Sequence, residues 1–442
     1  MKKIFYYENH PVRRVLIVGF GISGQSVLSY LQAYQLNCEI YDRVKAVADY
    51  SCYTRWDEVN LNRYDLIVLS PGVPVNQPGF QNLKLYQDKV VSDIELFICH
   101  VRRMYIERKK AVKIVAVSGS NGKSTVVSLL HHVLQSHGVS SALGGNIGIP
   151  ALSMLVKQAA VYILELSSFQ IDLLKKTTFD VVGILNICQD HLDRYPSFEA
   201  YTQSKLALLN YAGTAVLNQR LHKVVSGFEN TCHNRIWFNS ERDYIQNNYV
   251  IVDNEIFLDA SDIKLQGHHQ LENVLAVACL LKAIGFNPRD FRHHFNLFSA
   301  LAHRCKFVAE MNAVRYFNDS KATNIGAVIA SVQGITSAKN VILLLGGVAK
   351  NADFCQLRTV LKQYVRFVCI YGQDRDTIQK SVEAFVNCAS VLCLGDAFKL
   401  AVQKATEGEI VLLAPGCASF DEFCGFAERG EYFEKLVRQL QS

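Results

Sequence analysis

The stretch that most constrains the fold is residues 115–130, VAVSGSNGKSTVVSLL. It joins a short apolar run to a glycine- and serine-rich turn, which is followed by a run of helical length. A phosphate-binding P-loop is written G-x-x-x-x-G-K-[ST]. Gly122, Lys123 and Ser124 fit that pattern, but Val117 stands where the leading glycine belongs. The stretch is therefore either a variant P-loop or a serine-capped helix that carries a surface lysine.

The order strand, turn, helix favours the P-loop interpretation, in which Val117 ends the strand. Main-chain N–H groups of Gly119 to Lys123 can then form an anion-binding nest. In such a loop Lys123 supplies the cation for the β- and γ-phosphates, and Ser124 can hold a metal ion. We expect a nucleotide site here.

Length and composition exclude several other classes of protein. The 442 residues are 50% hydrophobic and 19% charged, which predicts a globular chain of two or three domains. A net charge of +6 is too weak to indicate a nucleic-acid partner. No apolar run approaches membrane-spanning length, and the first residues lack the apolar core of a signal peptide. Thirteen cysteines without a C-x-x-C pair are typical of reduced core residues, so we expect a cytoplasmic protein.

Apolar segments alternate with segments of helical length in three blocks, which predicts an α/β fold with parallel, doubly wound sheets. We expect domains at residues 1–100, 101–300 and 301–442. In the third block the predicted strands are 315–320, 341–347, 367–372, 391–395 and 409–416.

A second glycine turn opens the first block. Gly19, Gly21 and Gly24 form G-x-G-x-x-G between a strand and a helix, and Asp42 ends the next strand. Such a turn suits a pyrophosphate, and the acid suits a ribose hydroxyl, although any tight strand–helix turn favours glycine. Taken alone, this motif would indicate an NAD-dependent oxidoreductase, but that function would not explain the loop around Lys123.

Three further residues of the second block suit a phosphate or metal site. Glu165 ends an apolar strand beside the loop, and His191 follows another strand at its carboxyl end. Lys205 lies on a helix with an inward apolar face, where a lysine must pair, lose its proton or be modified. A lone Glu or His is more often structural, and a non-catalytic P-loop regulator stays possible at this point.

Seven segments together resemble the Mur ligases of peptidoglycan synthesis: SGSNGKST, GGNIGIP, LELSSFQ, DHLDRYPS, YFNDSKATN, GGVAKNADF and APGCASFDEFCGFAERGEYF. The resemblance spans nearly the whole chain in order. It implies a Rossmann-like N-terminal domain, a central P-loop ATPase-like domain with a mostly parallel sheet, and a Rossmann-like C-terminal domain. It also implies an ATP-dependent ligase that acts through an acyl phosphate. The implied substrates are UDP-N-acetylmuramoyl-L-alanine and D-glutamate, and we expect a monomer.

The resemblance implies a role for each matching residue. Lys123, Glu165, His191 and Lys205 would be catalytic, and two Mg²⁺ ions would be held by Ser124, Glu165, His191 and a Lys205 carboxylated by CO₂. ATP would contact Gly119, Ser120, Asn121, Gly122, Lys123, Ser124, Thr125, Asn273, Arg304 and Asp319. The UDP part of the substrate would contact Gly21, Ser23, Asp42, Ser70 and Gly72, and its muramoyl-alanine tail Asn146 and Ser167. The D-glutamate pocket would contain Lys321, Thr323, Lys350, Ser419 and Phe426.

Two positions depart from the family pattern. Arg43 follows Asp42 directly, whereas the family often has arginine two residues after this acid. Gln270 replaces the asparagine that usually follows the histidine at His269, so we leave Gln270 out of the expected site.

Overall fold

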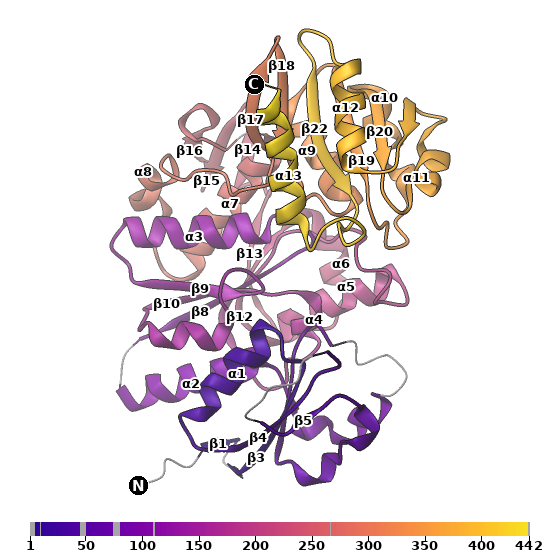
Figure 1. The fold of residues 1–442 in the computed structure, drawn as a ribbon. Helices are drawn as coiled ribbons and strands as arrows, with labels where there is room; N and C mark the ends of the chain where they lie inside the picture. The colour runs from indigo at the N-terminus through magenta and orange to yellow at the C-terminus, as the bar shows by residue number, and fades with distance from the viewer. Residues whose placement is uncertain are drawn as a thin grey trace.

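The computed structural model describes residues 5–8, 10–44, 50–73, 80–108, 111–265 and 267–440. Three parallel or mostly parallel sheets follow one another along the chain and lie one above another, from the indigo N-terminal part to the yellow C-terminal part (Figure 1). The α/β fold class predicted from the sequence is confirmed.

The first sheet has five parallel strands in the order β5-β4-β3-β6-β7. Counted along the chain this order is 3-2-1-4-5, as in a Rossmann fold. The strands are β3 (Arg14–Val18), β4 (Asn37–Tyr41), β5 (Cys52–Tyr53), β6 (Leu66–Leu69) and β7 (Val90–Val91). A hairpin of β1 (Phe5–Tyr7) and β2 (His10–Val12) precedes them, and the helices are α1 (Ile22–Gln32) and α2 (Asp93–Arg108).

The second sheet has six parallel strands in the order β13-β12-β11-β8-β10-β9. They are β8 (Lys113–Ser118), β9 (Ser141–Gly145), β10 (Val161–Glu165), β11 (Phe179–Ile184), β12 (Ala212–Asn218) and β13 (Asn234–Phe238). The helices are α3 (Lys123–Ser136), α4 (Ser168–Ile171), α5 (Phe198–Leu206), α6 (His222–Ser226), α7 (His268–Ala283) and α8 (Arg292–Phe295). A small antiparallel sheet of β14 (Tyr244–Gln246), β15 (Tyr249–Val252) and β16 (Glu255–Asp259) lies beside α7.

The third sheet has the order β17-β18-β22-β19-β20-β21 and is parallel except for the edge strand β17. Its strands are β17 (Lys306–Met311), β18 (Val314–Asn318), β19 (Val341–Gly346), β20 (Val365–Tyr371), β21 (Asn387–Ser390) and β22 (Ile410–Gly416). Its helices are α9 (Ile325–Ile335), α10 (Arg358–Tyr364), α11 (Arg375–Val382), α12 (Leu394–Lys404) and α13 (Phe426–Gln439).

The central strand β8 has an apolar run from Ile114 to Val117 because both of its faces are covered. Ile114 and Ala116 belong to a core that also contains Phe97 of α2, whereas Val115 and Val117 pack in another core with residues of α3 and α7. Because both faces are covered by other elements, the side chains from Ile114 to Ser118 are all buried, and only Lys113 at the start of the strand is exposed. This packing fixes the carboxyl end of β8, from which the glycine loop starts.

One predicted strand of the third block is wrong. Residues 391–395 do not form a strand: β21 ends at Ser390, and Leu394 begins α12. As the first residue of α12, Leu394 is buried in the core of the third sheet. The apolar run therefore predicted burial of this residue correctly but assigned it to the wrong element. The domain division at residues 100 and 300 stays a prediction, and residue 100 lies inside α2.

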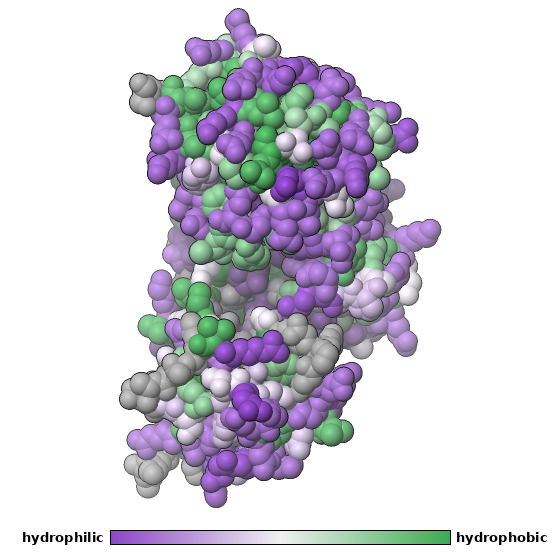
Figure 2. Space-filling model, turned by 45° about the vertical axis from the view of Figure 1, so that its right-hand side comes forward, coloured by the Kyte–Doolittle hydropathy of each residue, from purple (hydrophilic) through white to green (hydrophobic). Residues whose placement is uncertain are grey.

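No helix in the described part of the chain is both long and apolar enough to cross a membrane. The face of the molecule in Figure 2 is mostly hydrophilic, with its apolar residues scattered in small groups.

Candidate active site

The loop after β8 has the geometry of an anion-binding turn. Gly119 and Gly122 have φ values of +151° and +83°, which favour glycine, and α3 begins immediately at Lys123. The N–H groups in the first turn of α3 have no intrahelical acceptor and can bind an anion. The loop N–H groups of Ser120 and Asn121 instead donate to the carbonyl oxygen and the Oδ1 of Asn186, at 2.9 and 2.8 Å. A Cβ added at Gly122 would lie 2.6 Å from the Asn273 Oδ1, so Asn273 of α7 touches the loop directly.

Lys123 folds back over its own loop. Its Nζ donates to the carbonyl oxygens of Gly119 at 2.6 Å and Ser120 at 3.0 Å. Burial lowers the pKa of this ammonium, and the negative charges of Glu165 and Asp190 oppose that change. The cation is thus held at the phosphate-binding turn by groups that a phosphate can replace.

A cavity of about 330 Å³ opens in front of this loop, between the second and third sheets. It brings together residues that are far apart in the sequence and were predicted for ATP, metal or amino-acid binding. Those that line it are Ser120, Asn121, Gly122, Lys123, Ser124, Thr125, Asn146, Glu165, Ser167, His191, Lys205, Asn273, Arg304, Asp319, Lys321, Thr323, Lys350, Ser419 and Phe426. Gly119 lies behind these residues, and its carbonyl oxygen accepts hydrogen bonds from the Nζ atoms of Lys123 and Lys205.

Glu165 ends β10 inside this cavity and is 3% exposed. Its Oε1 accepts a hydrogen bond from the Asn146 Nδ2 at 2.8 Å, whereas its Oε2 has no hydrogen-bond partner among the described residues. A buried carboxylate oxygen without a partner is costly unless a cation meets it. The described residues contain no group of three His, Cys, Asp or Glu side chains that could hold a metal ion alone.

His191 follows β11 and takes a left-handed backbone conformation, with φ of +55°. Burial, together with the charges of Lys350 and Lys205, lowers the pKa of its imidazole to about 4 against the opposing effect of Asp190. The ring is therefore neutral near pH 7 and packs at 5.0 Å from the Phe169 ring. A neutral imidazole is the form that can hold a metal ion.

Lys205 is 2% exposed on α5. Its Nζ donates to the Gly119 carbonyl oxygen at 3.1 Å and lies 4.9 Å from the centre of the Tyr201 ring. Burial, and next the charge of Lys123, lower its pKa well below the usual value. The prediction that this lysine is buried is confirmed.

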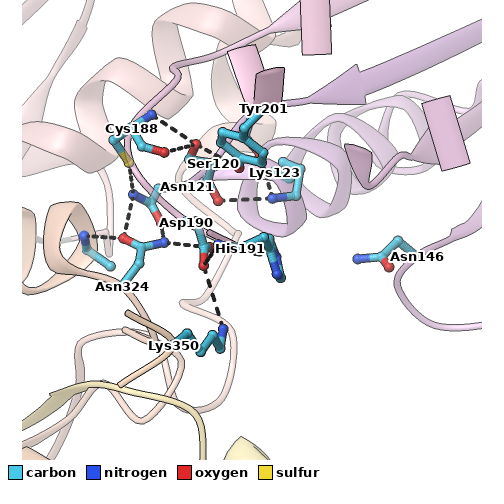
Figure 3. A network of polar contacts seen from close by, with 12 residues as sticks. Ser120, Asn121, Lys123, Asn146, Cys188, Asp190, His191, Tyr201, Asn324 and Lys350 are labelled. Carbon is cyan, nitrogen blue, oxygen red and sulfur yellow. Dashed lines mark hydrogen bonds and ion pairs between the residues drawn. The ribbon is translucent and has the colours of Figure 1, made fainter. Parts of the chain in front are cut away.

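The third sheet supplies the opposite wall. The Lys321 Nζ lies 3.9 Å from the centre of the Phe426 ring, and burial beside Arg304 and Lys123 lowers its pKa to about 8. The Lys350 Nζ lies 3.6 Å from the Asp190 Oδ1 (Figure 3). Two lysines thus face the loop from across the cavity.

Asp319 is buried on the same wall, and burial raises the pKa of its carboxyl to about 6. The Ser331 hydroxyl donates to it, and the positive charge of Arg304 partly offsets the effect of burial.

Sequence reasoning missed part of the polar network. Asp190 and Asn324 both line the cavity and connect the loop to the third sheet, as Figure 3 shows. Both stand inside motifs already recognised, DHLDRYPS and YFNDSKATN, but neither was assigned a role. Gln270 also lines the cavity, and its Oε1 accepts a hydrogen bond from the Asn273 Nδ2 at 3.0 Å.

The residues predicted for the UDP group lie elsewhere, around the first glycine turn. The Asp42 Oδ2 accepts the Phe20 N–H at 2.7 Å, and the Ser70 hydroxyl donates to the Gly19 carbonyl oxygen at 2.8 Å. Gly21 is the N-cap of α1. None of the five predicted residues, Gly21, Ser23, Asp42, Ser70 and Gly72, is among the described residues that line the large cavity. They form a second polar turn at the carboxyl edge of the first sheet.

Comparison with known proteins identifies the family. Three family descriptions match consecutive parts of the chain: "Mur ligase MurD-like, N-terminal domain" at 13–92, "Mur ligase middle domain" at 117–281 and "Mur ligase, glutamate ligase domain" at 303–417. A UDP-N-acetylmuramoylalanine–D-glutamate ligase of Francisella tularensis subsp. holarctica is 40% identical over 440 residues, which cover 99% of each chain. This chain belongs to the Mur ligase family.

Solved structures show the same fold. A pseudomurein peptide ligase type C from Methanothermus fervidus aligns with a TM-score of 0.62 at 15% identity, covering 97% of this Mur ligase and 100% of that chain. The UDP-N-acetylmuramate-alanine ligase MurC from Thermotoga maritima aligns with a TM-score of 0.57 at 15% identity, covering 97% and 99%. Mur ligases add amino acids to UDP-linked muramoyl precursors at the expense of ATP, in peptidoglycan synthesis. The protein is therefore an ATP-dependent, amide-forming ligase.

Proposed function

We propose that this Mur ligase adds D-glutamate to UDP-N-acetylmuramoyl-L-alanine and releases ADP and phosphate. One structural observation supports the proposal in addition to the similarity to the Francisella ligase. The cavity places the glycine loop with Lys123 opposite Lys321 and Lys350, so a triphosphate and a dicarboxylate can meet in one site. An NAD-dependent oxidoreductase would have no use for that arrangement of cations.

The chemistry requires an activated carboxylate, because a free carboxylate has a poor leaving group. In the proposed reaction the alanyl carboxylate attacks the γ-phosphate of ATP to give an acyl phosphate and ADP. The amine of D-glutamate then attacks the acyl carbon, and phosphate leaves. Lys123 offsets the charge that develops on the transferred phosphoryl group, while Lys321 and Lys350 hold the two carboxylates of D-glutamate. Thr323 and Ser419 supply hydroxyl donors in the same pocket.

We propose that Ser124, Glu165, His191 and Lys205 hold two Mg²⁺ ions when nucleotide is bound. Magnesium supplies charge neutralisation between the two anionic reactants and orients them. The Glu165 Oε2, which has no hydrogen-bond partner among the described residues, and the neutral ring of His191 fit this role. Lys205 would join as a carbamate, formed when its Nζ attacks CO₂ and releases a proton. Its burial without a carboxylate partner in the described part of the chain supports that modification.

We further propose that Gly21, Ser23, Asp42, Ser70 and Gly72 bind the UDP group, with Asn146 and Ser167 near the alanyl end. The role of Gln270 follows from its contact, since it orients Asn273 toward the nucleotide loop. We propose that the enzyme acts as a monomer. We place the reaction in the cytoplasm, where ATP and UDP-sugars are available.

The test is ADP release by the purified protein with UDP-N-acetylmuramoyl-L-alanine, Mg²⁺, ATP and one amino acid at a time. We expect turnover with D-glutamate and little with L-glutamate, because two fixed cations and the path of the amine define a handed site. Turnover with L-alanine or a diamino acid instead of D-glutamate would assign a sibling reaction. Turnover only when a folate substrate replaces the UDP substrate would assign a folate-type ligase. Binding of NADH without any ATP turnover would favour the oxidoreductase, and nucleotide binding without turnover would favour a regulator.

A further inference from the structure

One pair of side-chain amides joins the nucleotide loop to the third sheet. The Asn121 Nδ2 donates to the Asn324 Oδ1 at 3.2 Å, and the Asn324 Nδ2 donates back to the Asn121 Oδ1 at 3.0 Å (Figure 3). Asn121 belongs to the glycine loop, and Asn324 stands directly before α9. This reciprocal pair gives the loop a specific contact with the domain that carries the two lysines.

Asn324 has further partners that use the rest of its hydrogen-bonding capacity. Its Oδ1 accepts the Ala327 N–H at 2.9 Å, which caps α9, and its Nδ2 donates to the Asp190 Oδ2 at 3.1 Å. With two donors and two acceptor positions in use, the amide has one orientation that satisfies every group. Asn324 is 5% exposed, so an unmatched group here would be costly.

Asp190 carries the contact onward to the amino-acid side of the cavity. Its Oδ1 accepts the backbone N–H of His191 at 2.9 Å and lies 3.6 Å from the Lys350 Nζ. A continuous chain of polar contacts therefore runs from Asn121 through Asn324 and Asp190 to Lys350.

The backbone at this contact is built for close approach. A Cβ added at Gly326, in the first turn of α9, would lie 2.8 Å from the Cys188 Sγ and 3.3 Å from the Asn121 Nδ2. Glycine is unfavourable within a helix, so its place here is explained by the room it leaves for the loop. The polar pair and the missing side chain point independently to the same tight contact.

We infer that Asn324 is a positioning residue that couples the nucleotide loop to the amino-acid pocket. A nucleotide that orders the loop fixes Asn121, and through Asn324 and Asp190 it fixes where Lys350 stands. The coupling acts in both directions, because each ligand favours the same arrangement of the two domains. The inference rests on the proposed function only for the identity of the amino acid. The contact between Asn121 and Asn324 does not depend on which amino acid binds.

Two substitutions separate this coupling from the capping of α9. Asn324→Ser and Asn324→Asp both keep a side-chain oxygen that can cap the helix, but both remove the N–H donors toward Asn121 and Asp190. Asn324→Asp also sets a second negative charge against Asp190. We expect a melting temperature within about 2 °C of the wild type for Asn324→Ser. In contrast, kcat/KM for the amino acid should fall roughly tenfold or more, and further for Asn324→Asp. The KM for the UDP substrate should stay unchanged.

Coupling is measured directly as the ratio of ADP affinities with and without the amino acid, by calorimetry. The wild type should bind ADP more tightly when the amino acid is present, and Asn324→Ser should bring the ratio close to one. Gly326→Ala provides a second variant that does not depend on the amide. Alanine favours the helix, but its methyl group would push the loop away from α9. The substitution should therefore lower the ratio of ADP affinities without lowering the melting temperature. Asn287→Ser, at the N-cap of the 3₁₀ turn Pro288–Phe291, is the matched control and should behave as the wild type.

The inference would be overturned if Asn324→Ser showed the same ratio of ADP affinities as the wild type. It would also be overturned if kcat/KM fell equally for all three substrates and the melting temperature fell as well. Failure of the proposed function is visible separately, as a wild-type enzyme that does not turn over D-glutamate. The amino acid that it does accept then replaces D-glutamate in the same comparison.

Discussion

The chain contains two glycine-rich turns between a strand and a helix, and they differ in the charges that surround them. The first, from Gly19 to Gly24, is lined by backbone groups, with the Asp42 carboxylate accepting a turn N–H. The second, from Gly119 to Gly122, has Lys123 folded over it and Lys205 beneath it. Only the second turn opens into the large cavity, among the residues that the structure describes.

The difference teaches what a glycine turn can and cannot specify. Backbone N–H groups at a helix N-terminus suffice to bind a phosphate, and both turns offer them. Moving a phosphoryl group needs charges fixed where new charge develops, in a site sheltered from water. We therefore expect substitutions at the first turn to change the KM of one substrate, and substitutions at the second turn to change kcat.

The largest expected effect is that of Lys123→Ala. Loss of the cation at the phosphates should lower kcat by roughly a thousandfold or more, because the lysine acts on charge that develops in the transition state. Folding stability should change little, because the buried ammonium is desolvated in the free protein. The measurements are single-turnover kinetics and a thermal melt. Near-normal turnover of Lys123→Ala would contradict the proposed difference between the two turns, because neither would then contribute a catalytic cation.

Lys205→Arg should have the next largest effect. Arginine keeps the positive charge but cannot form a carbamate, so we expect a loss of roughly a hundredfold or more in turnover. Added Mg²⁺ should not restore it. Mass spectrometry under CO₂ and carbon-13 NMR with labelled bicarbonate test for the carbamate on the wild type. Full activity of Lys205→Arg would mean that the lysine only packs beneath the loop.

A smaller effect follows from Lys321, whose pKa burial lowers to about 8. The side chain is a cation below this pH and neutral above it, so affinity for a dicarboxylate should fall as the pH rises through about 8. Glutarate has no amine that titrates, and its inhibition constant should rise roughly tenfold between pH 7 and pH 9. Lys321→Arg should flatten this profile. The KM for the UDP substrate should change much less, and a parallel rise in both constants would contradict the assignment.

The sequence predicted the second turn better than the connections between domains. The strand, loop and helix around Lys123 are local, so glycine placement and periodicity were enough to predict them. The burial of Lys205 followed from the apolar face of its helix. The resemblance then supplied residues of three separate blocks, and the cavity brings most of them together.

Contacts across the cavity were not predictable in the same way. The Asn121–Asn324 pair joins residues 203 positions apart in the sequence. From the sequence alone, each asparagine looks like an ordinary residue at the start of a helix. The side chain of Asp190 resembles a turn residue until Lys350 is seen beside it. The antiparallel strands β14–β16 and β17 were not predicted, although β15 (Tyr249–Val252) and β17 (Lys306–Met311) both contain apolar runs. Such short runs do not distinguish a strand from other buried segments.

The smallest expected effect is at the first turn, with Asp42→Asn. Asparagine keeps an oxygen for the Phe20 N–H but loses the charge, and it cannot serve both that N–H and the Val44 N–H equally well. We expect the KM for UDP-N-acetylmuramoyl-L-alanine to rise roughly threefold, the difference between a charged and a neutral acceptor. Neither kcat nor the KM for ATP should change, because the cations around the second turn hold that end of the reaction. Initial rates over both substrate concentrations decide the matter: a fall in kcat that matches the rise in KM would show that the first turn takes part in transfer as well as binding.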